Sequence, residues 1–206
     1  MDKVSNTVRA VVVITFAFAF HGMYVLPTLW SMTNLPLMPD FFFDVIPFSS
    51  TAGHVADAVW VSLLVYFFVA NRDDAELLKY FVVVAGILMF VRSLCVLLNP
   101  VMPPLGMTGR PTVVLHEFAP GMFFSGHVAN SLLIYLMTPI RRTWMLFASL
   151  IIALGLVAAR AHYSIDIVGG YAIGWGVYCF CERYLRFIFL GANHCAQLQS
   201  DLAKPV

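Results

Sequence analysis

The sequence predicts an all-α membrane protein with six transmembrane helices. Of its 206 residues, 61% are hydrophobic and only 11% are charged, whereas about 25% of the residues of a soluble domain carry charge. The hydrophobic residues gather into long runs, and the polar breaks between these runs are too short to hold a soluble domain. We therefore expect one membrane domain that covers residues 1–206.

Six apolar runs approach the roughly 20 residues that a helix needs to cross the hydrocarbon core of a bilayer. The first run is long, lacks a small-residue cleavage site and is followed by further runs, so we expect an anchor rather than a removable signal peptide. No internal repeat separates the runs into halves. The expected spans are residues 9–32, 54–70, 80–99, 122–139, 144–160 and 163–190.

The distribution of basic residues predicts the orientation of these spans. If the N-terminus is cytoplasmic, nine of the twelve lysines and arginines face the cytoplasm, which satisfies the positive-inside rule: Lys3, Arg9, Arg72, Lys79, Arg141, Arg142, Arg183, Arg186 and Lys204. We expect both termini in the cytoplasm. The opposite ends of the spans carry a group of eight further ionisable residues: Arg92, Arg110, His116, Glu117, His127, Arg160, His162 and Asp166. This non-cytoplasmic face, whether periplasmic, extracellular or lumenal, is where we expect chemistry.

Charge and cysteine content exclude several classes of protein. The formal net charge of +1 leaves no long basic surface to neutralise nucleic-acid phosphates, so we expect no nucleic-acid partner. Cys179 and Cys181 would point to different faces of a helix, and Cys95 and Cys195 are isolated. We therefore expect no zinc site, no disulfide framework and no cofactor.

His162 and Asp166 are the clearest candidates for catalytic residues. Ionisable groups in membrane spans are costly and indicate function by default. A spacing of four places both side chains on one face of a helix, where they can touch. A carboxylate on one ring nitrogen fixes the tautomer and leaves the other nitrogen available as a nucleophile. The alternative is a polar pair that only satisfies itself.

The run Ser125-Gly126-His127 opens the fourth span and supplies a second histidine. Gly126 permits close approach of the backbone, and the first N–H groups of a helix can bind an anion such as phosphate. A histidine at the depth of His162 could protonate a leaving oxygen and later take a proton from an acceptor. The three residues His127, His162 and Asp166 therefore form the expected catalytic set.

Three arginines on the same face could bind phosphate oxygens. Arg92, Arg110 and Arg160 keep their charge and can offset the charge that develops during phosphoryl transfer. Arg110 and Arg160 could instead extend toward lipid headgroups, whereas Arg92 lies deeper in its span. We assign the remaining histidines to packing or interfacial solvation: His21, His54 with Asp57, and His194.

Residues 34–175 resemble the sphingomyelin synthase branch of the type 2 phosphatidic acid phosphatase superfamily. Four stretches carry the resemblance: the Met-Pro-Asp-Phe-Phe-Phe-Asp segment at residues 38–44, Arg92 followed by prolines at 100, 103 and 104, the Phe-Ser-Gly-His stretch at 124–127, and His-Tyr-Ser-Ile-Asp at 162–166. Pro139 followed by Arg141 and Arg142 is also similar to an inner loop of this branch.

The resemblance implies six helices around a lipid-accessible active-site chamber, without a metal. It implies transfer of phosphocholine or phosphoethanolamine from a glycerophospholipid to ceramide, with release of diacylglycerol. His162 would be the nucleophile, Asp166 would orient it, and His127 would serve the leaving and attacking oxygens. The intermediate would be a phosphohistidine, and Ser125, Gly126 and Tyr163 would join the arginines in the phosphate and headgroup site.

The sequence departs from the family where the headgroup would bind. An acidic residue usually precedes Ser-Gly-His by a few positions, whereas this chain has Ala119-Pro120-Gly121-Met122. Glu117 is the nearest carboxylate, and it could hold an amine headgroup or lie solvated in a loop. The sequence leaves the headgroup open, and it equally leaves open whether the chain is a monomer or a homo-oligomer.

Two alternatives remain. With the same His/His/Asp set, water could take the phosphoryl group from His162, which would make the chain a lipid phosphatase or a phospholipase C-like hydrolase. A non-catalytic transporter or lipid-binding protein is the other alternative, although transporters often show repeated halves and this sequence shows none. Transfer requires a chamber that excludes water and admits a second lipid.

Overall fold

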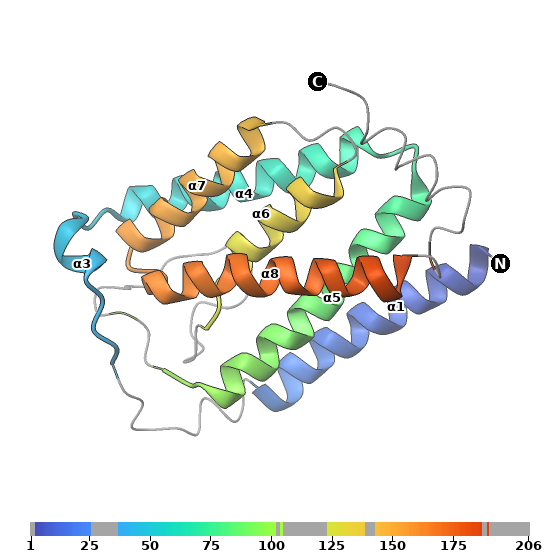
Figure 1. Cartoon of the computed structure of the whole chain (residues 1–206), viewed down its shortest axis with the longest axis horizontal. Helices are drawn as coiled ribbons and strands as arrows, with labels where there is room; N and C mark the ends of the chain where they lie inside the picture. Colours follow the sequence, from blue (N-terminus) through green and yellow to red (C-terminus); the bar gives the residue numbers. More distant parts are fainter. Residues whose placement is uncertain are drawn as a thin grey trace.

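The computed structural model describes residues 3–25, 37–101, 104, 123–138, 143–186 and 189. Every regular element in this part of the chain is a helix, which confirms the all-α prediction for these residues (Figure 1). The elements are α1 (Lys3–Phe20), the π-helical turn η1 (His21–Val25), α3 (Phe42–Val45), α4 (Ser50–Ala70), α5 (Ala75–Leu98), α6 (Gly126–Met137), α7 (Thr143–Ala158) and α8 (Ser164–Tyr184).

Four helices are long and apolar enough to cross a membrane: Asn6–Met23, Ser50–Ala70, Ala75–Leu98 and Ser164–Tyr184. The two remaining long helices, α6 and α7, are apolar but have only 12 and 16 residues. At about 1.5 Å per residue, α6 is about 18 Å long, shorter than the roughly 30 Å hydrocarbon core. Each of the six predicted runs contains a helix, and four of these helices reach the length of a span.

Polar caps place two helix starts earlier than the apolar runs predicted. The Ser49 hydroxyl oxygen accepts a bond of 3.2 Å from the Ala52 N–H, so α4 begins at Ser50 rather than near residue 54. Asp74 accepts a bond of 3.0 Å from the Leu77 N–H, so α5 begins at Ala75 rather than near residue 80. A hydropathy pattern locates the apolar body of a helix, whereas a cap fixes its first residue.

Large apolar side chains cover the outside of the bundle as well as its core. A soluble domain seldom exposes so many of them in contiguous patches, whereas lipid tails favour such contacts. They include Val11, Phe16, Val65, Phe147, Leu154, Val168, Trp175 and Phe180, all more than half exposed. The apolar exterior supports the assignment of this chain to membrane proteins.

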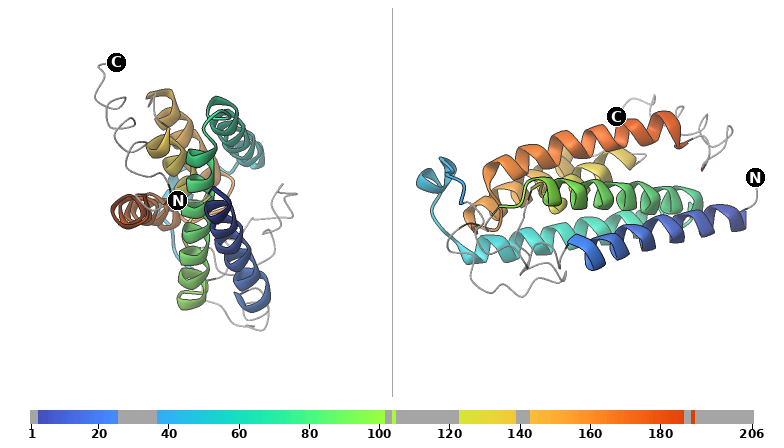
Figure 2. Two further views of the ribbon diagram at one scale, coloured as in Figure 1. Left: turned by 90° about the vertical axis from the view of Figure 1, so that its right-hand side faces the viewer. Right: turned by 90° about the horizontal axis from the view of Figure 1, so that it is seen from below.

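Glycines let two helix pairs pack closely. A Cβ atom at position 155 of α7 would lie 2.6 Å from the Ala52 carbonyl oxygen of α4, and one at position 86 of α5 would lie 3.0 Å from the Val13 side chain of α1. The α4 and α7 helices are antiparallel, since Ser49 at the start of α4 donates to Ala158 at the end of α7. The α1 and α5 helices are parallel, as Figure 2 shows from two sides.

The α6 and α8 helices form a third close pair, and they also run parallel. The N-cap residue Ser125 and Ala129 of α6 face Gly170 and Gly174 of α8, in the same order along both helices. In addition, α6 contacts α4, α5 and α7 and therefore occupies the centre of the bundle. Because the two helices are parallel, their N-termini lie together.

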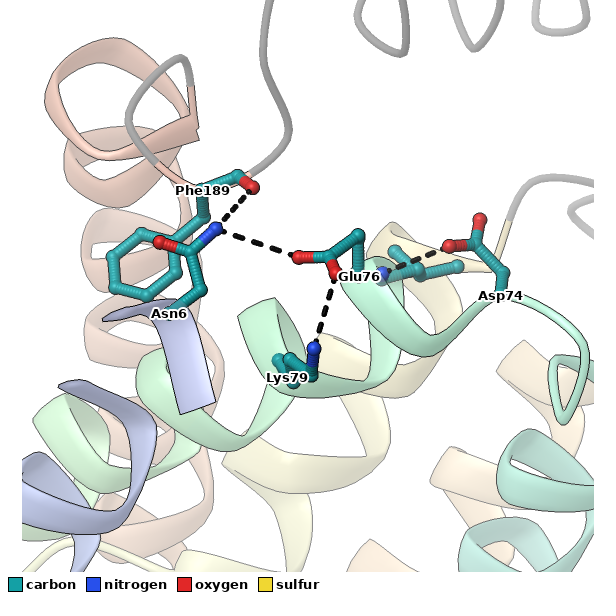
Figure 3. A network of polar contacts seen from close by, with 6 residues as sticks. Asn6, Asp74, Glu76, Lys79 and Phe189 are labelled. Carbon is teal, nitrogen blue, oxygen red and sulfur yellow. Dashed lines mark hydrogen bonds and ion pairs between the residues drawn. The ribbon is translucent and has the colours of Figure 1, made fainter. Parts of the chain in front are cut away.

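These directions give the bundle two different ends. At one end α4, α6 and α8 begin and α5 and α7 finish (Figure 1). We call it the histidine end, because it holds His127 and His162. At the other end, which we call the charged end, Glu76 links α1 and α5 by accepting bonds from Asn6 and Lys79 of 3.4 and 3.0 Å (Figure 3).

Candidate active site

His162 and Asp166 form the contact that their spacing predicts. His162 Nδ1 lies 3.3 Å from Asp166 Oδ2, and the residues are only 6% and 1% exposed. The same carboxylate oxygen accepts a bond of 3.1 Å from the Tyr163 N–H, which caps the start of α8. With its position fixed by this cap, Asp166 holds His162 by Nδ1. This arrangement assigns any nucleophilic role to Nε2.

The turn before α6 is fastened to the first turns of α8. The Ser125 N–H donates a bond of 3.0 Å to the Asp166 carbonyl oxygen. A Cβ atom at Gly170 would lie only 2.9 Å from the Ser125 carbonyl oxygen, so the glycine allows this close approach. His127 follows Ser125 by two residues, and its helix therefore begins beside the His162–Asp166 pair.

His127 contacts two residues of α4. Its Nε2 lies 3.5 Å from Asp57 Oδ1, and its ring centroid lies 4.7 Å from that of Trp60 in an edge-to-face arrangement. Asp57, which was expected with His54 to be a packing or solvation residue, therefore contacts a predicted catalytic residue, while His54 lies exposed on α4. An ionisable residue inside a span was the signal that could have found Asp57.

Arg92 reaches the same turn from α5. Its Nε donates a bond of 3.1 Å to the Phe124 carbonyl oxygen, and its Cδ and Nε atoms lie 3.5 Å from where a Cβ of Gly126 would be. A Cβ at position 126 would therefore lie in ordinary van der Waals contact with the Arg92 side chain. The structure thus brings together Arg92, Ser125, Gly126 and the His162–Asp166 pair.

The N-terminus of α6 has no side-chain cap among the described residues. Ser125 is its N-cap residue but makes no side-chain cap bond. The Ser125 hydroxyl is fully buried and has no hydrogen-bond partner in the described part of the chain. The first N–H groups of a helix lack partners within the helix and carry partial positive charge, so this end can accept an anion.

The α8 N-terminus, in contrast, is occupied by carboxylates. Besides Asp166, Asp40 accepts bonds from the Ser164 N–H and, at 3.0 Å, from the Ser164 hydroxyl. The Tyr163 hydroxyl accepts from the Met38 N–H at 3.4 Å, and the Tyr163 ring stacks on Phe43 with centroids 5.6 Å apart. The segment before α4 therefore covers the start of α8.

Arg160 and Tyr163, both expected in the headgroup site, hold this covering segment. The Arg160 Nη2 donates to the carbonyls of Phe43 and Ile46, and the guanidinium lies 4.2 Å from the Phe43 ring centroid. Its Nη1 is buried and has no partner among the described residues. Burial raises the pKa of Tyr163; the bond from the Met38 N–H lowers it, the Asp166 and Asp40 carboxylates raise it, and the net shift is upward. The phenol therefore stays neutral near pH 7.

Arg110 and Glu117 lie outside the described residues, as does His194. His21 is buried, and its Nδ1 lies 2.9 Å from the Ser93 hydroxyl, as expected for a packing residue. Within the described ranges no three His, Cys, Asp or Glu side chains are grouped so that they could hold a metal ion.

The described part of the chain defines a helical protein that has four helices long and apolar enough to span a membrane and a cluster of histidine, aspartate and arginine at one end. Comparison of the chain with models of known protein families finds no match, and comparison with curated proteins finds none.

Proposed function

We propose that this chain is a membrane phosphotransferase that moves a phospho-headgroup from a glycerophospholipid to a ceramide-like acceptor and releases diacylglycerol. One observation carries the proposal. The four sequence stretches that resemble the sphingomyelin synthase branch are far apart in the chain, yet they bond to one another at the histidine end: Asp40 to Ser164, Arg92 to Phe124, and Ser125 to Asp166.

The geometry supports a two-step reaction through His162. Asp166 holds the ring by Nδ1, so Nε2 would attack phosphorus and form a phosphohistidine. The phosphate oxygens would lie at the start of α6, where the helix N-terminus and the nearby Arg92 guanidinium favour negative charge. His127 would protonate the diacylglycerol oxygen as it leaves and then accept the proton of the attacking hydroxyl, a role that contributes about 10²–10⁴-fold to such reactions.

The membrane setting follows from the same helices. In the proposed topology α6 and α7 also cross the membrane and complete a six-span bundle with α6 at its centre. The histidine end would face away from the cytoplasm, since the charged end carries Arg72, Lys79, Arg183 and Arg186. A site at the edge of the bilayer would receive both lipids without removing their tails from the membrane.

To test the proposal, labelled phosphatidylcholine, phosphatidylethanolamine and ceramide are supplied together to the purified protein in mixed micelles, and the labelled products are identified. Transfer predicts label in a sphingolipid, and His162→Ala abolishes it, while His54→Ala, an exposed histidine of α4, keeps it. Label in free phosphocholine or phosphate would instead identify the hydrolase with the same catalytic set. Unchanged turnover in His162→Ala would overturn the mechanism in both forms.

A further inference from the structure

Asp57 contacts the candidate catalytic residue His127 but has no role in the reaction as proposed above. Asp57 and Trp60 are three residues apart on α4, so they share one face of the helix. Both contact His127 of α6, the carboxylate at 3.5 Å from Nε2 and the indole ring edge-to-face. His127 and Asp57 side chains are only 21% and 13% exposed.

The energetics of this site favour a dedicated role for the carboxylate. A charged aspartate in the body of an apolar helix is costly unless a partner offsets its desolvation. A carboxylate beside an imidazole stabilises the protonated form of the ring. The Trp60 ring on the side of the imidazole limits the rotation of His127. The pair therefore holds the histidine in one orientation and favours its acid form.

We propose that Asp57 is a positioning residue that makes His127 the general acid of the first step. The inference rests on the proposed function. In this proposal each histidine has its own carboxylate and its own role. Asp166 contacts His162 at Nδ1 and leaves Nε2 to attack phosphorus, whereas Asp57 contacts His127 at Nε2. Proton exchange with the lipid oxygens is then assigned to Nδ1 of His127.

The proposed steps conserve protons and electron pairs. In the first step the lone pair of His162 Nε2 forms the N–P bond, the P–O bond to diacylglycerol breaks, and the leaving oxygen takes the proton of the His127 imidazolium. In the second step the acceptor hydroxyl gives its proton to His127, its oxygen forms the new P–O bond, and the N–P bond breaks to restore His162. Asp57 stays ionised in both steps.

A change of leaving group tests this role, because a good leaving group needs no proton. Headgroup release is compared between a short-chain phospholipid, whose glycerol oxygen is a poor leaving group, and p-nitrophenyl phosphocholine or p-nitrophenyl phosphoethanolamine. Asp57→Asn and His127→Ala should lose about tenfold or more with the phospholipid, within the range of general acid catalysis. With the nitrophenyl esters, both variants should release the first equivalent of nitrophenol, before the phosphohistidine breaks down, at nearly the parent rate.

Matched variants separate this role from a loss of folding. Asp73→Asn, whose side chain is 96% exposed at the opposite end of α4, should behave as the parent with every substrate. In Asp57→Ala, added formate can take the place of the missing carboxylate and should restore phospholipid release. Full activity of Asp57→Asn with the nitrophenyl esters would itself show that the variant is folded.

The outcomes distinguish the two proposals. Suppose that His162→Ala is inactive with both substrates and Asp57→Asn matches the parent with both. Asp57 then has no positioning role, and the proposed transferase stands. The same conclusion follows if Asp57→Asn loses activity equally with both substrates and formate does not rescue Asp57→Ala. If the parent releases headgroup from neither substrate, or His162→Ala retains release from both, the proposed function itself fails.

Discussion

At the scale of single residues, Asp166 connects helix formation with chemistry. Its carboxylate accepts the Tyr163 N–H and lies against His162 Nδ1, so the bond that starts α8 also fixes the candidate nucleophile. The spacing of four predicted the histidine contact. The cap could be read from the sequence only in part, because Tyr163 is not among the residues that usually occupy an N-cap.

Residues from different helices were harder to assign. The sequence placed His127 beside a phosphate but gave no reason to connect it with Asp57, which is 70 residues earlier in the numbering and beside the more obvious His54. Similarly, Arg160 was expected to bind phosphate, whereas its guanidinium donates hydrogen bonds to the carbonyl oxygens of Phe43 and Ile46. Such partners depend on how helices rotate against each other.

Tyr163 gives a prediction for the pH dependence of stability. Burial raises its pKa above the ordinary value of 10.0, so above about pH 10 the unfolded chain loses the phenolic proton while the folded chain retains it. This contribution to stability is fully present below pH 10 and disappears as pH rises through the folded pKa. The melting temperature in detergent should therefore fall more steeply with alkaline pH in the parent than in Tyr163→Phe. Equal slopes would refute this assignment.

At the scale of elements, the parallel contact of α6 and α8 assembles the site. Ser125, Val128 and Ala129 pack against Gly170 and Gly174, and this contact brings the two histidine-bearing helix starts together. The sequence predicted both helices, but hydropathy does not indicate which helices become neighbours. The small residues at the contact are typical of close helix packing in membranes.

Two glycines of α8 provide a matched test of this contact. A Cβ at Gly170 would lie 2.9 Å from the Ser125 carbonyl oxygen, whereas a Cβ at Gly176 would meet nothing within 4 Å. Gly170→Ala should cost about 1–3 kcal/mol through overpacking, and displacement of the α6 start should reduce headgroup release about tenfold or more. Gly176→Ala should be neutral in both measurements, thermal unfolding in detergent and headgroup release. Equal behaviour of the two variants would contradict the packing argument.

At the scale of the whole molecule, the two ends of the bundle differ in chemistry. The charged end joins α1 and α5 through Asn6, Glu76 and Lys79 (Figure 3). In addition, Glu182 of α8 accepts bonds from Tyr80 of α5 and from Arg186. The histidine end holds the candidate active site. In the proposed orientation the two ends lie on opposite sides of the membrane, so a reagent that cannot cross the membrane should reach only one of them.

Cysteine labelling of intact cells or sealed vesicles tests that orientation. In a background without Cys95, Cys179, Cys181 and Cys195, Asp44→Cys at the histidine end should react with a membrane-impermeant maleimide from the non-cytoplasmic side. Asp73→Cys, in the loop between α4 and α5, should react only after the membrane is permeabilised. Both positions are exposed. The reverse pattern would place the site in the cytoplasm and overturn the proposed topology.

The sequence by itself determined the class of fold and the catalytic candidates that lie close together in the chain. Apolar run length and low charge predict membrane helices because burial in lipid depends on composition, and the His162–Asp166 contact follows from helical periodicity. Only the tertiary structure decided that α6 and α8 are parallel neighbours, that Asp57 faces His127 and that Asp40 covers the start of α8. These contacts join distant segments, and the shapes of packed side chains determine them, which local periodicity does not encode.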